Sequence, residues 1–489
     1  MVCSPSVKHR RGRKTNMIRT KAVLLMGSLM LASVVGRTKV PTEVAFVHVA
    51  VVPMTSEHVL GDHTVIVRGD RIVAIGPSSR VNVPEGAMRI EGRGYYLLPG
   101  LGEMHGHIPS PQAPPEYLEA VLFLYLANGV TTVRGMLGAP GQLELRERAN
   151  RGEILSPTLY LAGPSFNDAS INSPEEAVAK VREQKQQGWD LLKIHPGLTR
   201  EEYEAMARTA KEVGMRWVGH VPADVGLIRA LELGQETIDH LDGYIEYLEG
   251  DKGPLDRAKL EDIVRRTREA GAWVVPTMAL WEVLIGARDL ETLLAYPELR
   301  YMPPSMVENW VRAHRARVSD PRYDRTRAQR IAANRKEILR ALHRGGVRIL
   351  FGTDAPQQFS VPGFSIHREI PVLLECGMTP YEILQTATRN VGEYFRQKDR
   401  FGTIEVGARA DLILVKGNPL SDLGHLKNPA GVMVRGRWIP ESEIQRRLER
   451  ISETFRSGGV LRSGHTTRSS DRVGIPAQTS RICRRGTVA

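Results

Sequence analysis

The sequence is poor in cysteine, which argues against a fold held together by disulfide bonds. Its three cysteines are Cys3, Cys376 and Cys483, and they lie near the start, in the body and near the end of the chain. A disulfide framework needs an even set of cysteines at regular spacing. With 489 residues and 42% hydrophobic content, the chain can instead bury a large apolar core together with a second, smaller domain.

The sequence also lacks an apolar run long enough for a comfortable membrane span. The run at 22–35 is interrupted by Gly27 and Ser28 and is shorter than the roughly 20 residues that a spanning helix needs. It follows a basic stretch and precedes small residues, which is the order of a secretory signal peptide. We therefore expect residues 1–39 to be a cleaved signal peptide rather than a retained anchor, and we expect the protein to be exported, periplasmic or extracellular.

Acidic residues are missing from residues 1–39, which hold nine Lys and Arg, and residues 456–489 hold seven Arg against one Asp. These two segments account for the net charge of +12, so the middle of the chain is slightly acidic. A protein that reads nucleic acid needs its basic residues on a folded face. We therefore expect no nucleic-acid partner, and we interpret residues 457–489, which lack apolar periodicity, as a disordered tail.

The remaining chain shows two kinds of apolar pattern. Residues 40–97 and 400–442 alternate in short β-type runs separated by Gly, Pro or Asp, and we expect them to pair as one composite β-sandwich. Between them, strand-like and helix-like segments alternate, as in an α/β protein. Eight candidate strands follow one another, which predicts a (β/α)8 TIM barrel over residues 98–399: 97–104, 130–135, 158–162, 190–195, 216–220, 236–240, 272–276 and 347–353.

Helix-start signals support this alternation. Ser173-Pro174, Thr199 and Thr379-Pro380 each stand at the start of a helical pattern as N-cap residues. One connection is longer than the 2 to 6 residues that are usual in such repeats. It covers residues 281–335 and carries Trp281, Tyr296, Tyr301 and Trp310. We interpret it as a lid over the site, with a peripheral helical excursion as the alternative.

Residues that suit metal binding stand at the ends of the candidate strands. Imidazoles and carboxylates clustered in an apolar setting typically hold a divalent cation. In a (β/α)8 barrel the chemistry lies at the C-terminal ends of the strands, so these side chains are expected to converge. Any single histidine among them could be an ordinary structural residue, but the set as a whole favours a metal centre: His105, His107, Lys193, His220, His240 and Asp354.

These residues lie in motifs that resemble the metal-dependent amidohydrolase superfamily. The motifs are PGLGEMHGH, the strand with Lys193, GHVP, DH, FGTDAP and the closing GTIEVGARADLILV. Within the superfamily, the chain is similar to the imidazolonepropionase-like and Xaa-Pro dipeptidase (prolidase)-like branch, over about residues 44–440. It departs from the pattern at Glu103, where many members have Asp, and we expect this change to affect packing more than chemistry.

The resemblance implies two divalent ions, which we expect to be zinc. His105, His107 and Asp354 would hold the more buried ion, while His220 and His240 would hold the second. Lys193 would bridge both ions after carboxylation by CO2. An ammonium cannot ligate a cation and is costly to bury, whereas its carbamate is an anionic bidentate ligand; a lysine that snorkels to the barrel rim is the alternative.

The resemblance also implies a hydrolase of C–N bonds in which Asp354 is the catalytic acid–base residue. We expect a small-molecule substrate, an Xaa-Pro dipeptide or an N-acyl amino acid; a cyclic amide or a lactone is the alternative. Deamination and a non-catalytic interaction protein of the same fold are less favoured, because Lys193 and the other ligands are all present. Homo-oligomerisation is left open. Candidate substrate contacts are Arg134, His195, Tyr244, Tyr247 and His367.

Overall fold

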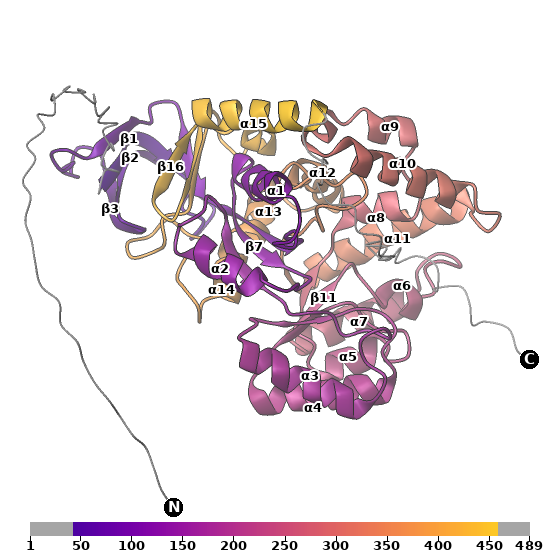
Figure 1. Ribbon diagram of the computed structural model, residues 1–489. Helices are drawn as coiled ribbons and strands as arrows, with labels where there is room; N and C mark the ends of the chain where they lie inside the picture. Colours follow the sequence, from indigo (N-terminus) through magenta and orange to yellow (C-terminus); the bar gives the residue numbers. More distant parts are fainter. Residues whose placement is uncertain (1–42, 458–489) are drawn as a thin grey trace, which may run out of the picture. The chain divides into compact units, whose positions relative to one another are not determined.

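A computed structural model describes residues 43–457 of the chain (Figure 1). The predicted signal peptide, and the predicted tail beyond residue 457, lie outside the described residues. None of the helices that are described is both long and apolar enough to cross a membrane. The structure therefore bears on the two predicted domains and on the site between the strand ends.

Strands from both ends of the described chain pair in one mixed sheet of eight strands. Strand β5 runs antiparallel to β14, with Leu98 opposite Ile413, which confirms that the two ends pair. The ladder is one continuous sheet within residues 43–457, so the second sheet of a sandwich remains a prediction. The strands are β1 (Glu43–Val51), β2 (Leu60–Arg68), β3 (Arg71–Pro77), β4 (Met88–Glu91), β5 (Tyr96–Pro99), β14 (Leu412–Val415), β15 (Gly431–Val434) and β16 (Arg437–Pro440).

The eight strands predicted for the central region are all present, and they run parallel in chain order. They form a three-stranded sheet, β6-β7-β8, and a five-stranded sheet, β13-β12-β11-β10-β9. This confirms an α/β arrangement of successive parallel strands. The strands are β6 (Leu101–Gly106), β7 (Val130–Gly135), β8 (Thr158–Leu161), β9 (Leu192–Ile194), β10 (Trp217–Gly219), β11 (Thr237–Asp239), β12 (Trp273–Val275) and β13 (Arg348–Ile349).

The first predicted strand, 97–104, is in fact two strands in two sheets. The chain passes from the mixed sheet to the parallel sheet at Gly100, between β5 and β6. A side chain at Gly100 would collide with Thr131 of the neighbouring strand β7. The apolar pattern of the two strands is continuous across the break, which is why the sequence did not reveal it.

The two parallel sheets meet at both edges without forming a continuous ladder in the described chain. At one edge, isolated bridges join Ala162 to Leu191 and Phe166 to Ile194, between β8 and β9. At the other edge, the backbone N–H of Asp354 donates to the carbonyl of His105 at 2.7 Å. These contacts bring the ligand-bearing strand ends together, while complete closure of a barrel remains a prediction.

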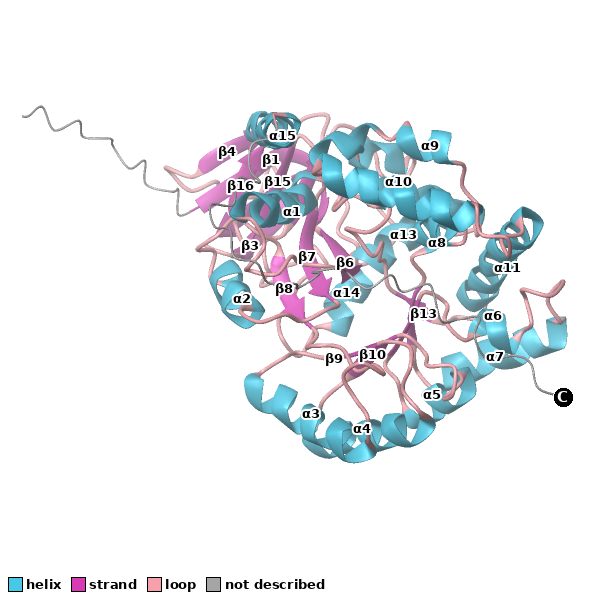
Figure 2. Cartoon of the chain, turned by 45° about the vertical axis from the view of Figure 1, so that its right-hand side comes forward, coloured by secondary structure: helices cyan, strands magenta, loops and turns pink. Residues whose placement is uncertain are grey.

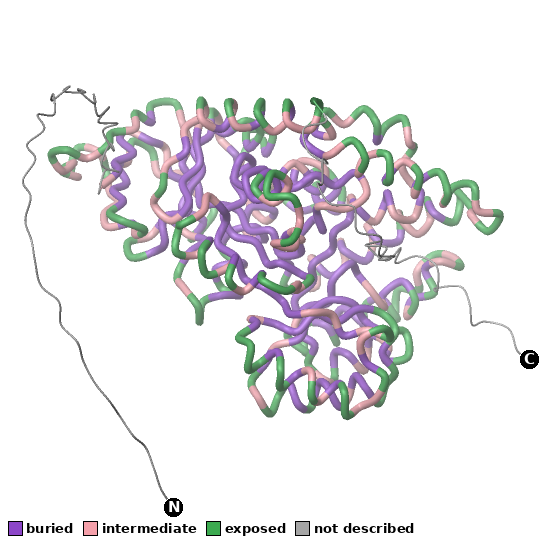
Figure 3. Tube along the Cα trace, in the orientation of Figure 1, coloured by how far each residue is buried: buried purple, intermediate pink, exposed green. Residues whose placement is uncertain are grey.

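Helices follow the parallel strands and cover them, and their ends match the predicted signals. Ser173, Thr199 and Thr379 are N-caps whose hydroxyls accept the N–H three residues on. Figure 2 shows α3, α4 and α5 outside β9 and β10, and Figure 3 shows that burial concentrates in the strands beneath. The helices are α1 (Pro115–Ala127), α2 (Gln142–Asn150), α3 (Pro174–Gln187), α4 (Arg200–Val213), α5 (Leu227–Leu233), α6 (Tyr244–Tyr247), α7 (Arg257–Glu269), α12 (Ile366–Glu375), α13 (Pro380–Ala387) and α14 (Arg389–Tyr394).

Two further regions are helical: one agrees with the helical excursion that was the alternative for residues 281–335, and the other was not predicted. The connection at 281–335 is helical, and its aromatic residues Tyr301 and Trp310 are buried in the main core. The helix α15, after the mixed sheet, buries Ile444 and Leu448 and packs beside α1. The elements are α8 (Met278–Leu284), α9 (Leu290–Leu294), the 3-10 helix η1 (Pro297–Tyr301), α10 (Pro304–Val318), α11 (Arg325–Arg344), the 3-10 helix η2 (Leu423–Leu426) and α15 (Glu441–Arg456).

A buried carboxylate ties the helical connection to the rest of the fold. Glu369 of α12 accepts the N–H groups of Met278 and Ala279, each at 2.8 Å, at the first turn of α8. A carboxylate is favourable at a helix N-terminus, where N–H groups lack partners. Burial of Glu369 nevertheless raises its pKa to about 7.

This shift makes the stability depend on pH in a defined direction. Because the folded-state pKa of Glu369 lies above the ordinary 4.5, the stabilisation is complete below about pH 4.5 and is lost as the pH rises through about 7. From pH 5 to pH 8, the wild type should lose on the order of 1–3 kcal/mol of unfolding free energy relative to Glu369→Gln, which cannot titrate. Denaturant unfolding at both pH values measures this, with the exposed Glu375→Gln as control; equal pH dependences in Glu369→Gln and wild type would contradict it.

Candidate metal centre

The predicted metal-binding residues come together at the C-terminal ends of the parallel strands. His105 lies in β6 and Lys193 in β9, whereas His220 and His240 directly follow β10 and β11, and Asp354 lies in the loop after β13. Ligand atoms of His105, His240 and Asp354 all lie within 4.8 Å of one another, and these three residues are buried. The site is thus assembled from segments about 250 residues apart in the sequence.

Asp354 is the carboxylate at the centre of one half of the cluster. Its Oδ1 atom lies 2.7 Å from Nε2 of His107 and 3.7 Å from Nε2 of His105. Its Oδ2 atom lies 3.8 Å from Nε2 of His240. Three imidazoles therefore direct a nitrogen at one carboxylate.

Lys193 lies at the bottom of this cluster and is fully buried. Its Nζ atom is 3.3 Å from Nε2 of His105, and burial lowers its pKa to about 8. Gly219 makes room for it, because an added Cβ there would meet the Ile194 carbonyl at 2.6 Å and the Lys193 Nζ at 3.2 Å. The alternative of a lysine that snorkels to the rim is therefore wrong.

His220 and His240 form the other half of the cluster. Their ring centroids are 4.6 Å apart, and the rings of His240 and His105 are 4.3 Å apart. Nδ1 of His220 contacts Asp242 at 2.7 Å, and Nδ1 of His240 contacts Thr277 at 2.7 Å. Both rings thus use Nδ1 for orientation and keep Nε2 for the site.

The donor set fits a divalent cation. Nε2 of His240 is buried and makes no hydrogen bond with any residue in the described part of the chain. Such an atom is rare in a folded protein unless an unseen partner satisfies it. Burial also lowers the pKa values of His105 and His240 well below the ordinary value, which keeps both rings neutral and able to coordinate.

The strained backbone conformations of the described chain include four residues at this site. His240, Leu241, Thr277 and Asp354 have φ values of 63°, 54°, 44° and 60°, in the left-handed region that L residues rarely adopt. Residues in such conformations cost of order 1–3 kcal/mol each and gather at functional sites. The cluster is thus held in a geometry that the backbone does not favour by itself.

Residues that the sequence analysis overlooked hold these ligands in place. Asp239 accepts from Nδ1 of His105 at 2.7 Å, and it is itself held by Thr237 at 2.6 Å and by Arg134 at 3.0 Å. Asp242 and Thr277 do the same for His220 and His240. Such partners fix the tautomer and orientation of ligand imidazoles. The DH motif contains Asp239, so its role could have been suspected from the sequence.

Two of the predicted substrate contacts are corrected by the structure. Arg134 is fully buried and donates to Asp239, to Thr237 and to the carbonyl of Met104, so it supports the site from below and cannot meet a substrate carboxylate. Tyr244 is also fully buried. Its hydroxyl bonds to Thr267 of α7 at 2.9 Å, which directs it into the helical layer instead of the site.

The structural role of Arg134 can be tested by its removal. Arg134→Met leaves the buried Asp239 without its cation, and breaking a buried pair costs about 3–5 kcal/mol. Denaturant unfolding should show this loss, whereas Arg151→Met, which removes an exposed partner of Glu153, should leave the stability close to that of the wild type. If Arg134→Met had wild-type stability and a raised KM, Arg134 would instead be a substrate-binding residue.

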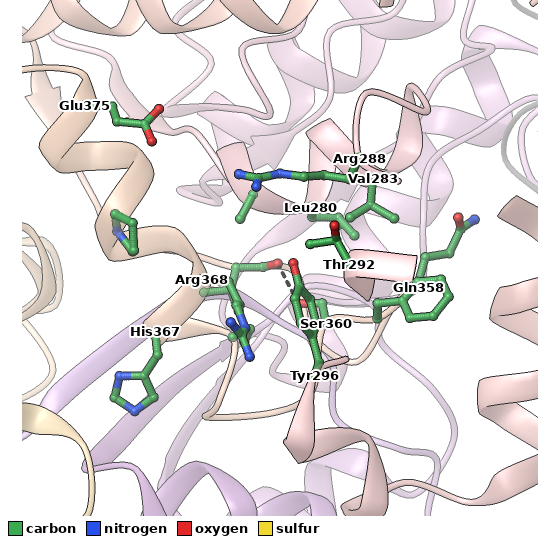
Figure 4. Close-up of a pocket in the computed structure, with 15 residues that line it drawn as sticks. Leu280, Val283, Arg288, Thr292, Tyr296, Gln358, Ser360, His367, Arg368 and Glu375 are labelled. Atoms are coloured by element: carbon green, nitrogen blue, oxygen red, sulfur yellow. Dashed lines mark hydrogen bonds between the residues drawn. The ribbon is translucent and has the colours of Figure 1, made fainter. Parts of the chain in front are cut away.

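The other predicted contacts lie around the cluster. Tyr247 ends the short helix α6 and is half-buried against the main core. His367 of α12 bonds to Asn128 at 3.2 Å, and burial lowers its pKa to about 3. It lines a cavity of about 240 Å3 between α8, α9 and α12, which Figure 4 shows with Tyr296, Ser360 and Arg368. The cavity wall includes Thr353, next to Asp354, but none of the clustered histidines, and a contact of His367 with the substrate remains a prediction.

His195 does reach the cluster. Its ring stacks on that of His220, with centroids 5.0 Å apart, and its Nδ1 lies 2.5 Å from the hydroxyl of Ser165. Burial, with Lys193, His220 and His107 nearby, lowers its pKa well below the ordinary value. The signal for it was its position two residues after Lys193 on the same strand.

Glu103 joins the two segments that carry the first set of ligands. Its carboxylate accepts from the N–H of His105 at 3.0 Å and from the N–H and hydroxyl of Thr353 at 2.8 and 2.5 Å. Burial raises its pKa to about 8. The residue fixes the approach of β6 to the Asp354 segment, which agrees with an effect on packing.

The chain is similar in sequence to proteins of known activity. An ochratoxinase from Aspergillus niger is 21% identical over 438 residues, which cover 75% of this chain and 80% of that protein. An adenine deaminase from Ruegeria sp. (strain TM1040) is 24% identical over 431 residues, which cover 85% of this chain and 60% of that protein. The two relatives act on different compounds, so the similarity leaves the substrate open.

A solved structure and a family model complete the comparison. The crystal structure of a Xaa-Pro dipeptidase with methionine in its active site aligns with a TM-score of 0.62 at 24% identity, covering 81% of this chain and all of that one. At this identity, the likeness shows a shared fold. The model of the amidohydrolase family matches residues 96–439, which is more than half of the sequence, and the chain therefore belongs to the amidohydrolase family.

Proposed function

We propose that the protein is a binuclear metal-dependent hydrolase of amide or peptide bonds, with Xaa-Pro dipeptides or N-acyl amino acids as substrates. Membership of the amidohydrolase family makes it a hydrolase that acts on carbon–nitrogen bonds. The observation that carries the finer proposal is the buried cluster in which Lys193 lies 3.3 Å from His105, beside Nε2 of His240, which makes no hydrogen bond within residues 43–457. A site for one cation would have no second ion for the buried Lys193 to bridge.

The residues divide into two sets around Lys193. His105, His107 and Asp354 would hold one cation, His220 and His240 the other, and carboxylated Lys193 would bridge them. Two zinc ions, when bound, would supply an activated water and a Lewis acid for the substrate carbonyl. The fully buried position of Lys193 supports carboxylation, because the charged ammonium is poorly solvated there and the neutral amine reacts with CO2.

The contacts of Asp354 support a role in proton transfer. Its Oδ1 atom contacts His107, and Gln357 donates to the same oxygen at 2.9 Å, so the carboxylate is held in one orientation. A carboxylate in this position can accept a proton from the attacking water and deliver it to the leaving nitrogen. This is the step that splits an amide into an acid and an amine.

Two other reactions use the same cluster. A cyclic amide or a lactone presents the same carbonyl to the site, and relatives with names as different as ochratoxinase and adenine deaminase keep this alternative open. Deamination is less favoured, although one relative is an adenine deaminase, because a mononuclear site has no use for Lys193. A role as a non-catalytic partner protein does not suit a complete ligand set.

The test is a substrate screen with the purified, zinc-loaded full chain. Xaa-Pro dipeptides, N-acyl amino acids, lactones and adenine are each incubated with the protein, and released amine, acid or ammonia is measured. Release of amino acids from dipeptides or N-acyl amino acids, absent in Asp354→Asn, supports the proposal. Turnover of lactones or adenine alone would overturn it, as would a zinc content well below two per chain.

The domain organisation and the location belong to the same proposal. We propose that residues 98–399 form a closed (β/α)8 barrel, that residues 40–97 and 400–442 form the β-sandwich, and that residues 281–335 act as a lid.

We also propose export after removal of residues 1–39. The mature protein, by N-terminal sequencing, should then begin between about residues 33 and 42. Intact protein starting at Met1 or Met17 would contradict export.

A further inference from the structure

His195 lies among the proposed ligands although neither proposed metal position needs it. It follows Lys193 by two residues, and side chains two residues apart in an extended strand point to the same face. Its ring stacks on that of His220 at 5.0 Å and 27°, and Lys193 and His107 lie close enough to act on its charge. The imidazole therefore faces the site and not the surrounding helices.

The hydrogen bond between His195 and Ser165 allows the neutral ring to carry its proton on Nε2, since either partner can be the donor. Its Nδ1 lies 2.5 Å from Oγ of Ser165, and the same Oγ accepts from Nδ2 of Asn167 at 3.3 Å. A serine hydroxyl that accepts from one group still has its own hydrogen to donate. When Ser165 donates its hydrogen to Nδ1, the neutral ring carries its own N–H at Nε2. This Nε2 atom makes no hydrogen bond with another described residue.

The segment that holds His195 is itself fixed. The backbone carbonyl of Ser165 accepts from Nζ of Lys180 at 2.5 Å and from the hydroxyl of Ser170 at 2.7 Å. The neighbouring Phe166 bridges to Ile194 of β9. The Nε2–H of His195 is thus a donor of preset direction, which is the property that makes a donor effective at a developing negative charge.

His195 and Asp354 contact different members of the cluster. Asp354 contacts His105, His107 and His240, whereas His195 contacts His220. In amide hydrolysis, the attacking water and the carbonyl oxygen occupy different positions, because the water adds to the face of the carbonyl while the oxygen stays bonded to the carbon. If Asp354 accepts the proton of the water, the group beside His220 is the one available to donate to the carbonyl oxygen.

We propose that Nε2 of His195 donates a hydrogen bond to the scissile carbonyl oxygen and to the oxyanion that forms from it. This rests on the proposed amide hydrolysis. The substrate class is therefore one whose carbonyl oxygen becomes a tetrahedral oxyanion beside His220. Ser165 is the positioning residue, because it fixes the tautomer of His195.

Three variants separate this role from simple packing. His195→Phe keeps a ring against His220 but removes the donor, and His195→Gln restores an amide N–H near the Nε2 position. Ser165→Ala leaves the ring but frees its tautomer. The control is His343→Gln, since His343 lies on α11 and pairs with Glu382 at 3.3 Å.

The first readout is turnover of the best dipeptide by zinc-loaded protein. His195→Phe should lower kcat on the order of 10²-fold or more with little change in KM, as loss of an oxyanion donor does. His195→Gln should recover at least part of this loss, Ser165→Ala should lose less, and His343→Gln should match the wild type. Wild-type kcat in His195→Phe would overturn the proposal.

The second readout does not depend on turnover. Methylphosphonate, a tetrahedral oxyanion, is titrated calorimetrically into zinc-loaded wild type and variants, after their zinc content is measured. His195→Phe should bind it roughly 10-fold to 100-fold more weakly, the usual loss of a hydrogen bond to a charged group, and His195→Gln should recover affinity. Equal affinity in wild type and His195→Phe would overturn the proposal, and so would loss of zinc from both His195 variants, which would make His195 a support for His220. Failure of amide turnover with this binding pattern intact would instead reject the proposed function.

Discussion

Asp354→Asn is expected to give a protein that retains zinc but does not turn over substrate. The amide oxygen of Asn can still coordinate, and the histidines and Lys193 remain, so at least one ion should stay bound. The variant loses the group that accepts a proton from water and delivers it to the leaving nitrogen. That role is usually worth about 10² to 10⁴ in rate. Zinc content and kcat, measured on the same preparation, test the prediction.

The rival interpretation is that Asp354 is only a ligand. Excess zinc should then return Asp354→Asn to near wild-type kcat, and that outcome would rule out the proton-transfer role. Gln357→Leu is a useful companion, because it removes the 2.9 Å hydrogen bond to Asp354 Oδ1 and keeps the carboxylate. It should retain zinc and lose much less activity than Asp354→Asn.

Lys193→Ala is expected to lose both zinc and activity. The substitution removes the proposed bridge and leaves a cavity beside His105, where the wild-type Nζ lies at 3.3 Å. Acetate or propionate should enter that cavity and restore part of the zinc content and activity, since a carboxylate can replace a carbamate. Metal analysis and kinetics with and without added acid measure the effect.

A matched control is Lys180→Ala. Lys180 is half-buried on α3 and donates to the carbonyl of Ser165 rather than to the metal-ligand cluster. It should keep its zinc and show no response to added acetate. Full zinc content and full activity in Lys193→Ala would refute carboxylation of Lys193.

The positions of the metal-binding residues were predictable because parallel strands share one C-terminal edge. His105, Lys193, His220, His240 and Asp354 each end an apolar run, and that position alone brings them together. Arg134 also ends such a run, but its side chain points into the interior, where Asp239 neutralises it. A strand-end position therefore predicts proximity to the site and does not predict the direction of a side chain.

Other features depended on contacts that no local pattern contains. The break at Gly100 follows from the approach of Thr131, about 30 residues later in the chain. Tyr244 follows His240 closely, but the left-handed conformation at Leu241 turns the chain away and directs the hydroxyl toward α7. By contrast, the apolar spacing of Ile444, Leu448 and Ile451 in α15 was readable as a helix and was overlooked.

The left-handed backbone at His240, Leu241, Thr277 and Asp354 makes thermal stability and catalytic activity compete. These conformations cost conformational free energy, and packing in the rest of the fold maintains them in the protein without metal. Selection for heat resistance alone should collect glycine or asparagine at these positions, because those residues tolerate the conformation. A protein selected in this way would gain thermal stability and lose catalytic activity. Stabilising this enzyme without loss of activity therefore has to begin at a distance from the cluster, on surfaces such as those of α10 and α15.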